Sequence, residues 1–184
     1  MNVLFLTFVA QMSLLAMLTV GYGVIWLFPA LFLIHDLEEI VGLKSWIERN
    51  GEAVGGRFPR FAPMFRGYTT ERMVKAVVEE YVLCLLLTAL ASTGKLPLLL
   101  LWYGAFAAYT FHLVVHVAQS VVLRMYVPAV ATSVLLLPIS LWLMYEQAYV
   151  LGMSLSDSVL YVILGFALVA LNLLLVQPGR RGFP

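Results

Sequence analysis

The amino-acid sequence predicts an all-α protein, a bundle of about six transmembrane helices that forms one integral membrane domain over residues 1–184. Three observations support this prediction. The chain is 62% hydrophobic and only 11% charged, whereas soluble domains typically carry about 25% charged residues. Its mean hydropathy is +0.96. Apolar runs long enough to cross a bilayer, which takes about 20 residues, recur along the whole chain.

Each helix is predicted from an apolar run and from the residues that interrupt it. Residues 1–20 have no basic leader and no small-residue cleavage pattern, so we interpret them as a retained helix. Gly21 and Gly23 separate this helix from the second; without that break the two form one long tilted helix and the bundle has five. Later runs lie between charged residues such as Lys95 and Arg124. The predicted helices are 2–20, 24–48, 71–92, 96–124, 127–149 and 157–177.

One long polar segment, residues 48–75, separates the second and third predicted helices. It is rich in basic residues, and the positive-inside rule places such a concentration in the cytoplasm. Its glycines and prolines predict a cytoplasmic basic loop over residues 49–70. Alternating the helices from this loop puts Arg124 and the Arg180–Arg181 tail on the same side. We therefore expect both termini in the cytoplasm, with the plasma membrane of a prokaryote as the location. The basic residues are Arg49, Arg57, Arg60, Arg66, Arg72 and Lys75.

Composition also argues against a nucleic-acid-binding protein and against a site built from cysteines. The formal net charge is only +1, and no basic motif alternates with aromatic residues, so we expect no nucleic-acid partner. The single cysteine, Cys84, excludes a disulfide within the chain and any cluster of thiolate ligands. The expected partners are membrane lipids, a hydrophobic or amphiphilic small-molecule substrate, and a second copy of the chain as an open option.

The titratable residues inside the apolar runs are the strongest functional signal. Ionisable side chains cost about 2.5 to 3.5 kcal/mol each at the centre of a membrane helix, so they persist where they have a partner or a function. In His-Asp-Leu-Glu-Glu, His35, Glu38 and Glu39 share one helix face. His112 and His116, four residues apart, share another. Two imidazoles at this spacing are how one helix offers two ligands to one metal ion.

Depth along the helices is a second and independent constraint. With a rise of about 1.5 Å per residue, Glu38 lies about 15 Å and Glu80 about 14 Å from the predicted cytoplasmic ends of their helices. By the same count His112 lies about 18 Å, His116 about 12 Å and Asn172 about 12 Å in. Helices that run in opposite directions therefore bring these polar groups to one level.

Five carboxylates lie near this level with no lysine or arginine beside them, so they must hold protons, line a water cavity or bind cations. Three imidazoles with carboxylates and no sulfur suit zinc, iron or manganese, and the ligands suffice for one or two ions. A structural network of His–Glu hydrogen bonds is the alternative. The carboxylates are Asp36, Glu38, Glu39, Glu79 and Glu80.

Glu79 and Glu80 differ in what surrounds them on their own helix. Glu71, Lys75 and Glu79 follow at four-residue steps and fit a ladder of surface ion pairs. Glu80 has only apolar or small residues three and four positions away, which favours Glu80 as a site residue.

These motifs resemble a known family. The His35–Glu39 string is similar to the signature of the HXXEE-motif integral membrane proteins, and the Glu79–Glu80 pair and His112-x-x-x-His116 resemble its other hallmarks. The resemblance covers most of the chain, and the family is a domain of unknown function. It implies a metal-dependent membrane enzyme that uses these same residues, and it supplies no substrate.

The leading hypothesis is a metal-dependent intramembrane hydrolase that acts on a lipid or isoprenoid-like amphiphile. A glutamate not bound to the metal would serve as general base, with Glu39 and Glu79 as the candidates. The cofactor would be one or two divalent transition-metal ions, zinc or iron, with manganese as a further option. The expected metal ligands are His35, Glu38, Glu39, Glu80, His112 and His116.

Two other functions remain open. A di-iron membrane oxidoreductase, a desaturase or hydroxylase, would also take Glu and His from bundle helices, although the Glu-x-x-His order of soluble di-iron bundles is absent here. A metal or proton transporter would need polar groups along the whole path, and the outer halves of these helices are nearly without charge.

Overall fold

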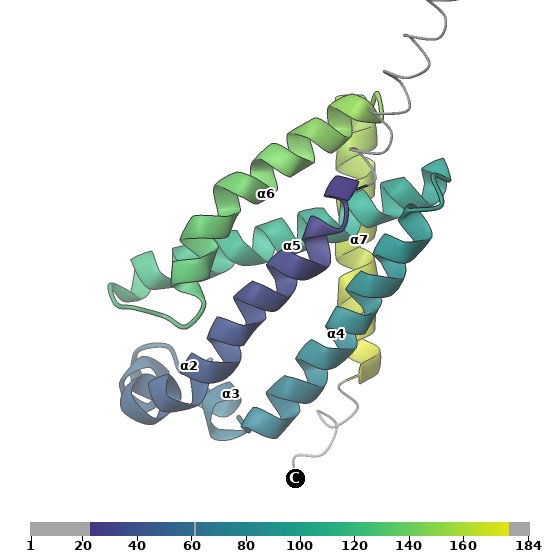
Figure 1. Ribbon diagram of the computed structural model, residues 1–184. Helices are drawn as coiled ribbons and strands as arrows, with labels where there is room; N and C mark the ends of the chain where they lie inside the picture. Colours follow the sequence, from purple (N-terminus) through teal and green to yellow (C-terminus); the bar gives the residue numbers. More distant parts are fainter. Residues whose placement is uncertain (1–22, 61, 177–184) are drawn as a thin grey trace, which may run out of the picture.

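The computed structural model describes residues 23–60 and 62–176. Within them the protein is all-helical, as predicted, and contains no strand (Figure 1). Apolar runs without β-branched alternation favour helices, since a membrane leaves no other way to satisfy the backbone of a single segment. The helices are α2 (Leu27–Arg57), α3 (Ala62–Arg66), α4 (Thr70–Ala91), α5 (Leu96–Leu123), α6 (Val130–Val150) and α7 (Leu155–Val176).

The predicted number of about six helices is slightly off, because the described residues contain five long helices and the five-residue α3. The predicted helix 2–20 lies outside the described residues. The last four predicted ranges agree with α4, α5, α6 and α7 to within a few residues. Their ends follow local signals: Thr69 caps α4 by accepting a hydrogen bond from the Arg72 amide, and Gly152 has a left-handed φ of 61° before α7.

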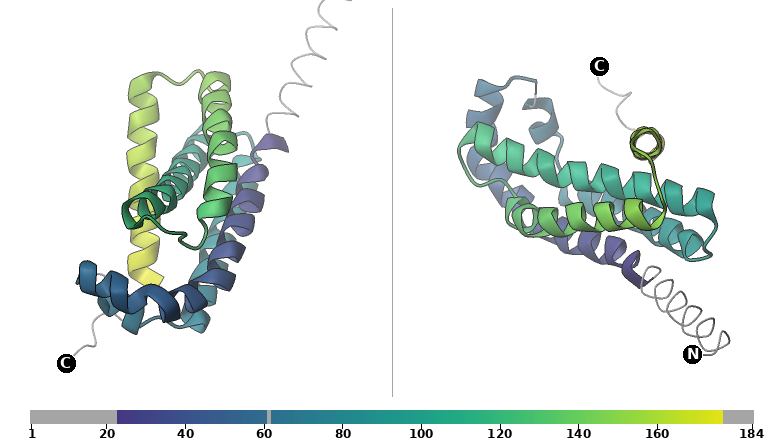
Figure 2. Two further views of the ribbon diagram at one scale, coloured as in Figure 1. Left: turned by 90° about the vertical axis from the view of Figure 1, so that its left-hand side faces the viewer. Right: turned by 90° about the horizontal axis from the view of Figure 1, so that it is seen from above.

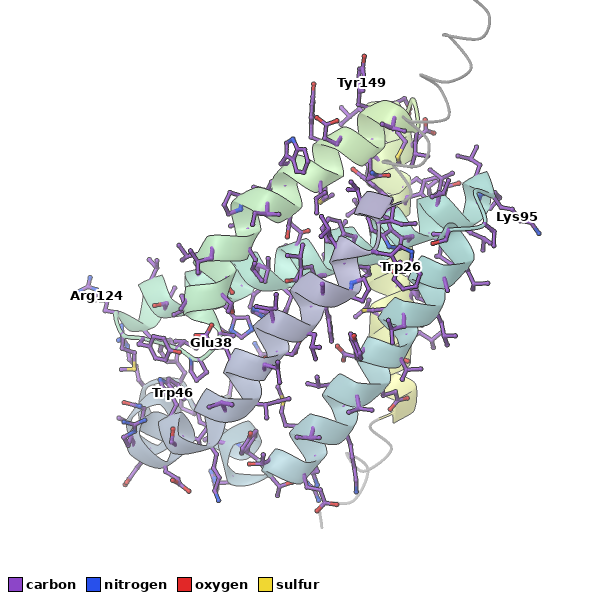
Figure 3. The ribbon with its side chains drawn as sticks, in the orientation of Figure 1. Trp26, Glu38, Trp46, Lys95, Arg124 and Tyr149 are labelled. Atoms are coloured by element: carbon purple, nitrogen blue, oxygen red, sulfur yellow. The ribbon has the colours of Figure 1, made fainter. Side chains whose placement is uncertain are left out.

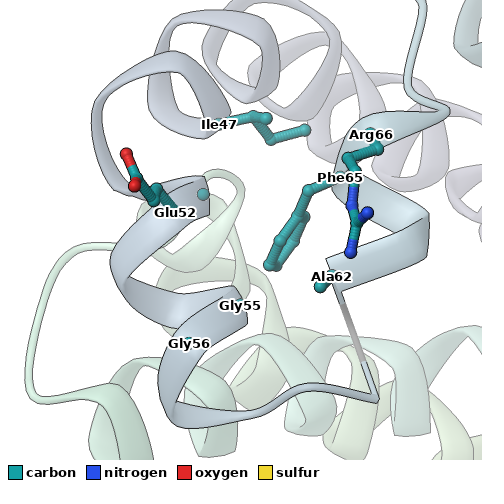
Figure 4. Close-up of a pocket in the computed structure, with 8 residues that line it drawn as sticks. Ile47, Glu52, Gly55, Gly56, Ala62, Phe65 and Arg66 are labelled. Carbon is teal, nitrogen blue, oxygen red and sulfur yellow. The ribbon is translucent and has the colours of Figure 1, made fainter.

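The segment expected to be loop is helical over residues 49–57, because α2 continues to Arg57. The glycines there serve packing, not a turn. A Cβ on Gly55 would lie 3.1 Å from the Cβ of Ala62, and one on Gly51 would lie 3.7 Å from the Cβ of Phe65. Phe65 of α3 therefore packs on a face of α2 that lacks side chains (Figure 4).

The C-terminal part of α2 changes direction and runs across the ends of the other helices (Figure 2). Trp46 lies where the direction changes (Figure 3) and donates a hydrogen bond of 2.7 Å from Nε1 to the Tyr126 carbonyl. Ser45 Oγ donates to the Gly42 carbonyl at 3.1 Å, and Gly/Ser pairs are a common cause of helix kinks. The polar end of α2 is thereby tied to the loop between α5 and α6.

Helix α5 is the centre of the described fold and contacts α2, α4, α6 and α7. Its core is aromatic: the Phe28 ring of α2 lies 5.9 Å from Trp102 and 5.2 Å from Phe106, centroid to centroid. Trp102 donates from Nε1 to Thr88 Oγ1 of α4 at 3.1 Å. This cluster fixes the relative positions of α2, α4 and α5, the helices that carry the predicted site residues.

The backbones of α7 and α5 are in direct contact where the two helices cross. A Cβ on Gly165 would overlap the Gly104 carbonyl, and a Cβ on Gly104 would overlap the Tyr161 carbonyl. Glycines at a helix crossing permit this approach. Apart from this contact, residues 155–172 of α7 are largely exposed.

Three of the described helices, α5, α6 and α7, are long and apolar enough to cross a membrane. This agrees with the prediction of a membrane protein, although fewer helices are long and apolar enough to cross a membrane than the six predicted from the sequence. The acidic residues of the His35–Glu39 string and the polar C-terminal part of α2 explain why that helix does not qualify.

Candidate metal centre

Four side chains of the ligand type meet between α2 and α5. His35, Glu39, His112 and His116 each offer one nitrogen or oxygen atom, and these atoms all lie within 4.8 Å of one another. The two imidazole Nε2 atoms of His112 and His116 are 3.0 Å apart. Glu39 Oε2 lies 4.0 Å from His112 Nε2 and 3.8 Å from His116 Nε2. Each helix supplies a pair four residues apart, so both ligand faces result from one turn of helix.

The His35 ring is held in the orientation and tautomer that a metal ligand needs. Its Nδ1 lies 3.2 Å from Thr132 Oγ1, and that hydroxyl donates its only proton to the Ala129 carbonyl at 3.2 Å. In the tautomer that satisfies both contacts, Nδ1 carries the proton and donates to Thr132, and Nε2 keeps a lone pair. His35 is fully buried, and its Nε2 has no hydrogen-bond partner within residues 23–60 and 62–176.

Glu38 does not join this cluster but faces the start of α6 (Figure 3). Its Oε2 accepts a hydrogen bond of 2.7 Å from the Thr132 amide, and its Oε1 accepts one of 3.4 Å from the Ala131 amide. Helix α6 has no side-chain cap of its own at Ala129. A carboxylate from another helix thus satisfies the free amides at this N-terminus and complements the helix dipole.

Tyr126, in the loop before α6, completes this arrangement by donating from its hydroxyl to Glu38 Oε1 at 2.6 Å. Burial, together with the hydrogen bond to Glu38, raises the pKa of Tyr126 to about 12. The phenol therefore keeps its proton at neutral pH and remains a donor. The contacts of Glu38 and Tyr126 position Thr132, which in turn orients His35.

A cavity of about 310 Å³ lies against the cluster, and α2, α4, α5 and α7 contribute its walls. Its polar lining includes Glu39 and His112 of the cluster together with Asp36 and Glu80. Asp36 is 5% exposed, and no described residue forms a hydrogen bond with its Oδ2. Most of the remaining wall is apolar. A larger hollow of about 480 Å³ between the end of α2 and α3 contains none of the predicted site residues (Figure 4).

The structure brings together four of the predicted ligands, and Glu80 lines the adjoining cavity. It does not bring in the sixth predicted ligand, Glu38, nor Glu79, which the sequence predicted as a candidate general base. Glu38 caps α6, and Glu79 is exposed on α4 and does not line the cavity. The reason is helical geometry, since neighbouring residues point about 100° apart. Sequence reasoning did not identify Thr132 and Tyr126, because no spacing on α2 indicates which residues of another helix will meet it.

The four donors fit a metal ion of the predicted kind. Two atoms that bind one zinc ion at 2.0–2.1 Å lie at most about 4.2 Å apart, and the His112–His116, Glu39–His116 and Glu39–His112 separations of 3.0, 3.8 and 4.0 Å meet this limit. All four ligand atoms lie within 4.8 Å of one another, so any wider pair would need to close by at most about 0.6 Å. Three imidazoles and one carboxylate suit zinc, iron or manganese.

The described residues combine three helices that are long and apolar enough to cross a membrane with a partly buried His/Glu cluster that could hold a metal ion. The chain belongs to the family described as proteins of unknown function with an HXXEE motif, whose sequence model matches residues 26–143, more than half of the chain. This confirms the resemblance found in the sequence. No curated protein and no solved structure matches the chain.

Proposed function

We propose that the protein is a metal-dependent intramembrane hydrolase that acts on a lipid or isoprenoid-like amphiphile. The observation that carries this proposal is the convergence of His35, Glu39, His112 and His116, with the buried Nε2 of His35 lacking a partner in the part of the chain that the structure describes. A purely structural network would leave no such nitrogen, because an unsatisfied buried polar atom costs about 1–3 kcal/mol.

In this proposal the metal ligands, the proton acceptor and the apolar wall of the cavity have distinct roles. His35, His112, His116 and Glu39 hold the ion, which would polarise the scissile group and lower the pKa of a water molecule. Glu80 on the cavity wall then serves as the proton acceptor, the role for which the sequence predicted Glu39 or Glu79. The apolar remainder of the cavity receives the chain of the substrate and excludes bulk water.

The experiment that tests the proposal is metal content by plasma mass spectrometry on protein purified in mild detergent without chelator. We expect about one equivalent of zinc, iron or manganese in the wild type and its loss in His35→Ala and His116→Ala. Glu39→Gln should also lose metal, whereas Glu79→Gln should keep it, because Glu79 is exposed and lies outside the cavity. Wild-type protein without metal would overturn the proposal.

A di-iron oxidoreductase is the second candidate, and one observation favours it. Asp36 and Glu80 line the same cavity as Glu39, and Asp36 interacts electrostatically with both glutamates, so carboxylates are present for a second ion. Two equivalents of iron and an absorption band that changes with oxygen would support this function over hydrolysis. One equivalent of zinc would exclude it.

We also propose the membrane placement that the sequence predicts, with both termini and residues 49–70 in the cytoplasm. The three helices of membrane-spanning length support a membrane location. The basic residues on the segment between α2 and α4 support its orientation. The ligand cluster would then lie in the cytoplasmic half of the bilayer.

A further inference from the structure

The cavity beside the ligand cluster has two chemically different zones. Phe28 and Phe32 precede Asp36 on α2 by two turns and one turn, and Leu83 and Leu87 follow Glu80 on α4 by one turn and two turns. Because α2 and α4 run in opposite directions (Figure 1), these four apolar residues lie toward the same end of the cavity. The polar residues form a second zone, here called the head zone: Asp36, Glu39, Glu80, Tyr109, His112 and Asn172. Beyond it, on the side away from Leu83 and Leu87, Met73, Ala76 and Val77 of α4 also line the cavity.

The head zone contains two buried polar groups whose hydrogen-bonding capacity is unused. Asp36 and Tyr109 are each 5% exposed, and neither Asp36 Oδ2 nor the Tyr109 hydroxyl has a partner among the described residues. They come from different helices, α2 and α5, and line the same cavity. Buried polar atoms are nearly always satisfied, so unused atoms on a cavity wall indicate a ligand or ordered water.

The charge of the head zone restricts what that ligand can be. Three of its residues are carboxylic acids, and Asp36 interacts electrostatically with both Glu39 and Glu80. No lysine or arginine is among the described residues that line the cavity. A phosphate, sulfate or carboxylate headgroup would meet repulsion here, whereas a group that donates hydrogen bonds finds several acceptors.

We propose that the head zone binds the headgroup of an amphiphile that carries no negative charge and donates hydrogen bonds, with an ammonium group preferred over a hydroxyl. The apolar zone receives its chain. From Phe28 to Asp36 the helix rises about 12 Å, which gives the length of this zone. The volume of about 310 Å³ admits one slender chain. The inference rests on the proposed function, because it names the substrate class of the same site.

The test is equilibrium binding of three radiolabelled probes to protein in nanodiscs, with empty nanodiscs as background. The probes share one chain and differ in headgroup: dodecylamine, dodecanol and dodecyl phosphate. Metal is removed first by chelation, so that an amine cannot bind through the ion. We expect dodecylamine to bind at least about tenfold more tightly than dodecyl phosphate, with dodecanol between them.

Variants then assign the preference to the head zone. Asp36→Asn and Glu80→Gln should each lower the amine preference severalfold, and Tyr109→Phe should weaken all three probes alike by removing a neutral hydroxyl. Glu79→Gln removes a neighbouring charge that lies outside the cavity and should change nothing. Equal binding of the three probes, tighter binding of the phosphate, or an unchanged preference in both acid variants would overturn the inference.

Failure of this inference and failure of the proposed function are distinguishable. Metal in the wild type together with equal binding of the three probes would support the hydrolase proposal and contradict the proposal that the head zone binds a headgroup. An amine preference that depends on Asp36, in protein that never contains metal, would support the head zone and overturn the hydrolase.

Discussion

Glu38 and Glu39 are neighbours in the sequence and serve different parts of the molecule. Glu39 points to the imidazoles of His112 and His116, and Glu38 points to the amides of Ala131 and Thr132. The two glutamates of the motif therefore hold two different helices against α2. One completes the ligand cluster, and the other stabilises the helix that orients His35.

Substitution should separate these two roles. Glu38→Ala should lower the unfolding free energy of the metal-free protein by about 0.5–2 kcal/mol, the usual cost of losing an N-terminal cap, and should keep metal at saturation. Glu39→Ala should lose the metal and change the stability of the metal-free protein less. Thermal melting in nanodiscs and metal content together measure both effects. Equal loss of metal in the two variants would contradict this division.

Thr132 gives a second prediction at the residue scale. Thr132→Val removes the hydroxyl that accepts from His35 Nδ1, and we expect the metal affinity to fall about 10–100-fold. Thr132→Ser keeps the hydroxyl and should stay close to the wild type. Competition with a chelator of known affinity measures the difference. If valine and serine bind metal equally well, the hydrogen bond does not orient the ligand.

The histidine pair was predictable, whereas the division between Glu38 and Glu39 was not. Four-residue spacing places His112 and His116 on one face whatever surrounds them, so the sequence alone indicates a shared ligand. Which glutamate faces the imidazoles depends on where α5 and α6 lie around α2. That arrangement depends on packing between helices, and the sequence pattern of a single helix carries no information about it. The same reason explains why Glu80, and not Glu79, lines the cavity.

At the scale of elements, α7 depends on its crossing with α5. The backbones meet at Gly104 and Gly165, and one turn and two turns later α7 supplies Val169 and Asn172 to the cavity. This crossing therefore sets the position of the fourth cavity wall.

Replacing Gly165 by alanine should force the two helices apart. A Cβ there would overlap the backbone of Gly104, which cannot move aside as a flexible side chain can. We therefore expect the free energy of unfolding to fall by about 1–3 kcal/mol. Gly56→Ala is the matched control, because a Cβ on Gly56 meets nothing within 4 Å. Thermal melting compares the two variants. Similar melting temperatures would show that α7 tolerates displacement.

Hydropathy and its interruptions predicted where the helices lie. The prediction that residues 49–57 form a loop was wrong, for a physical reason. Glycine is a turn residue when it is exposed and a packing residue when another helix lies on it. Gly51 and Gly55 are of the second kind, because α3 covers them, and their sequence surroundings do not reveal α3.

At the scale of the whole molecule, the orientation in the membrane gives a further prediction. In a Cys84→Ala background, Arg60→Cys should react with a membrane-impermeant maleimide from the cytoplasmic side, and Lys95→Cys from the opposite side. Helix α5 separates Lys95 from Arg124 by 28 residues, or about 42 Å, more than the hydrocarbon thickness (Figure 3). Labelling of both cysteines from one side would contradict this topology.

Residues 26–143, the part of the chain that the family model matches, end before α7 begins at Leu155. All four residues of the ligand cluster lie inside that part, and Val169 and Asn172 lie outside it. The ligand cluster and the cavity wall that α7 supplies are thus encoded in separable stretches of chain. A chimera that exchanges only α7 would keep every ligand and receive a different wall, which offers a route to altered substrate choice with the reactive centre untouched.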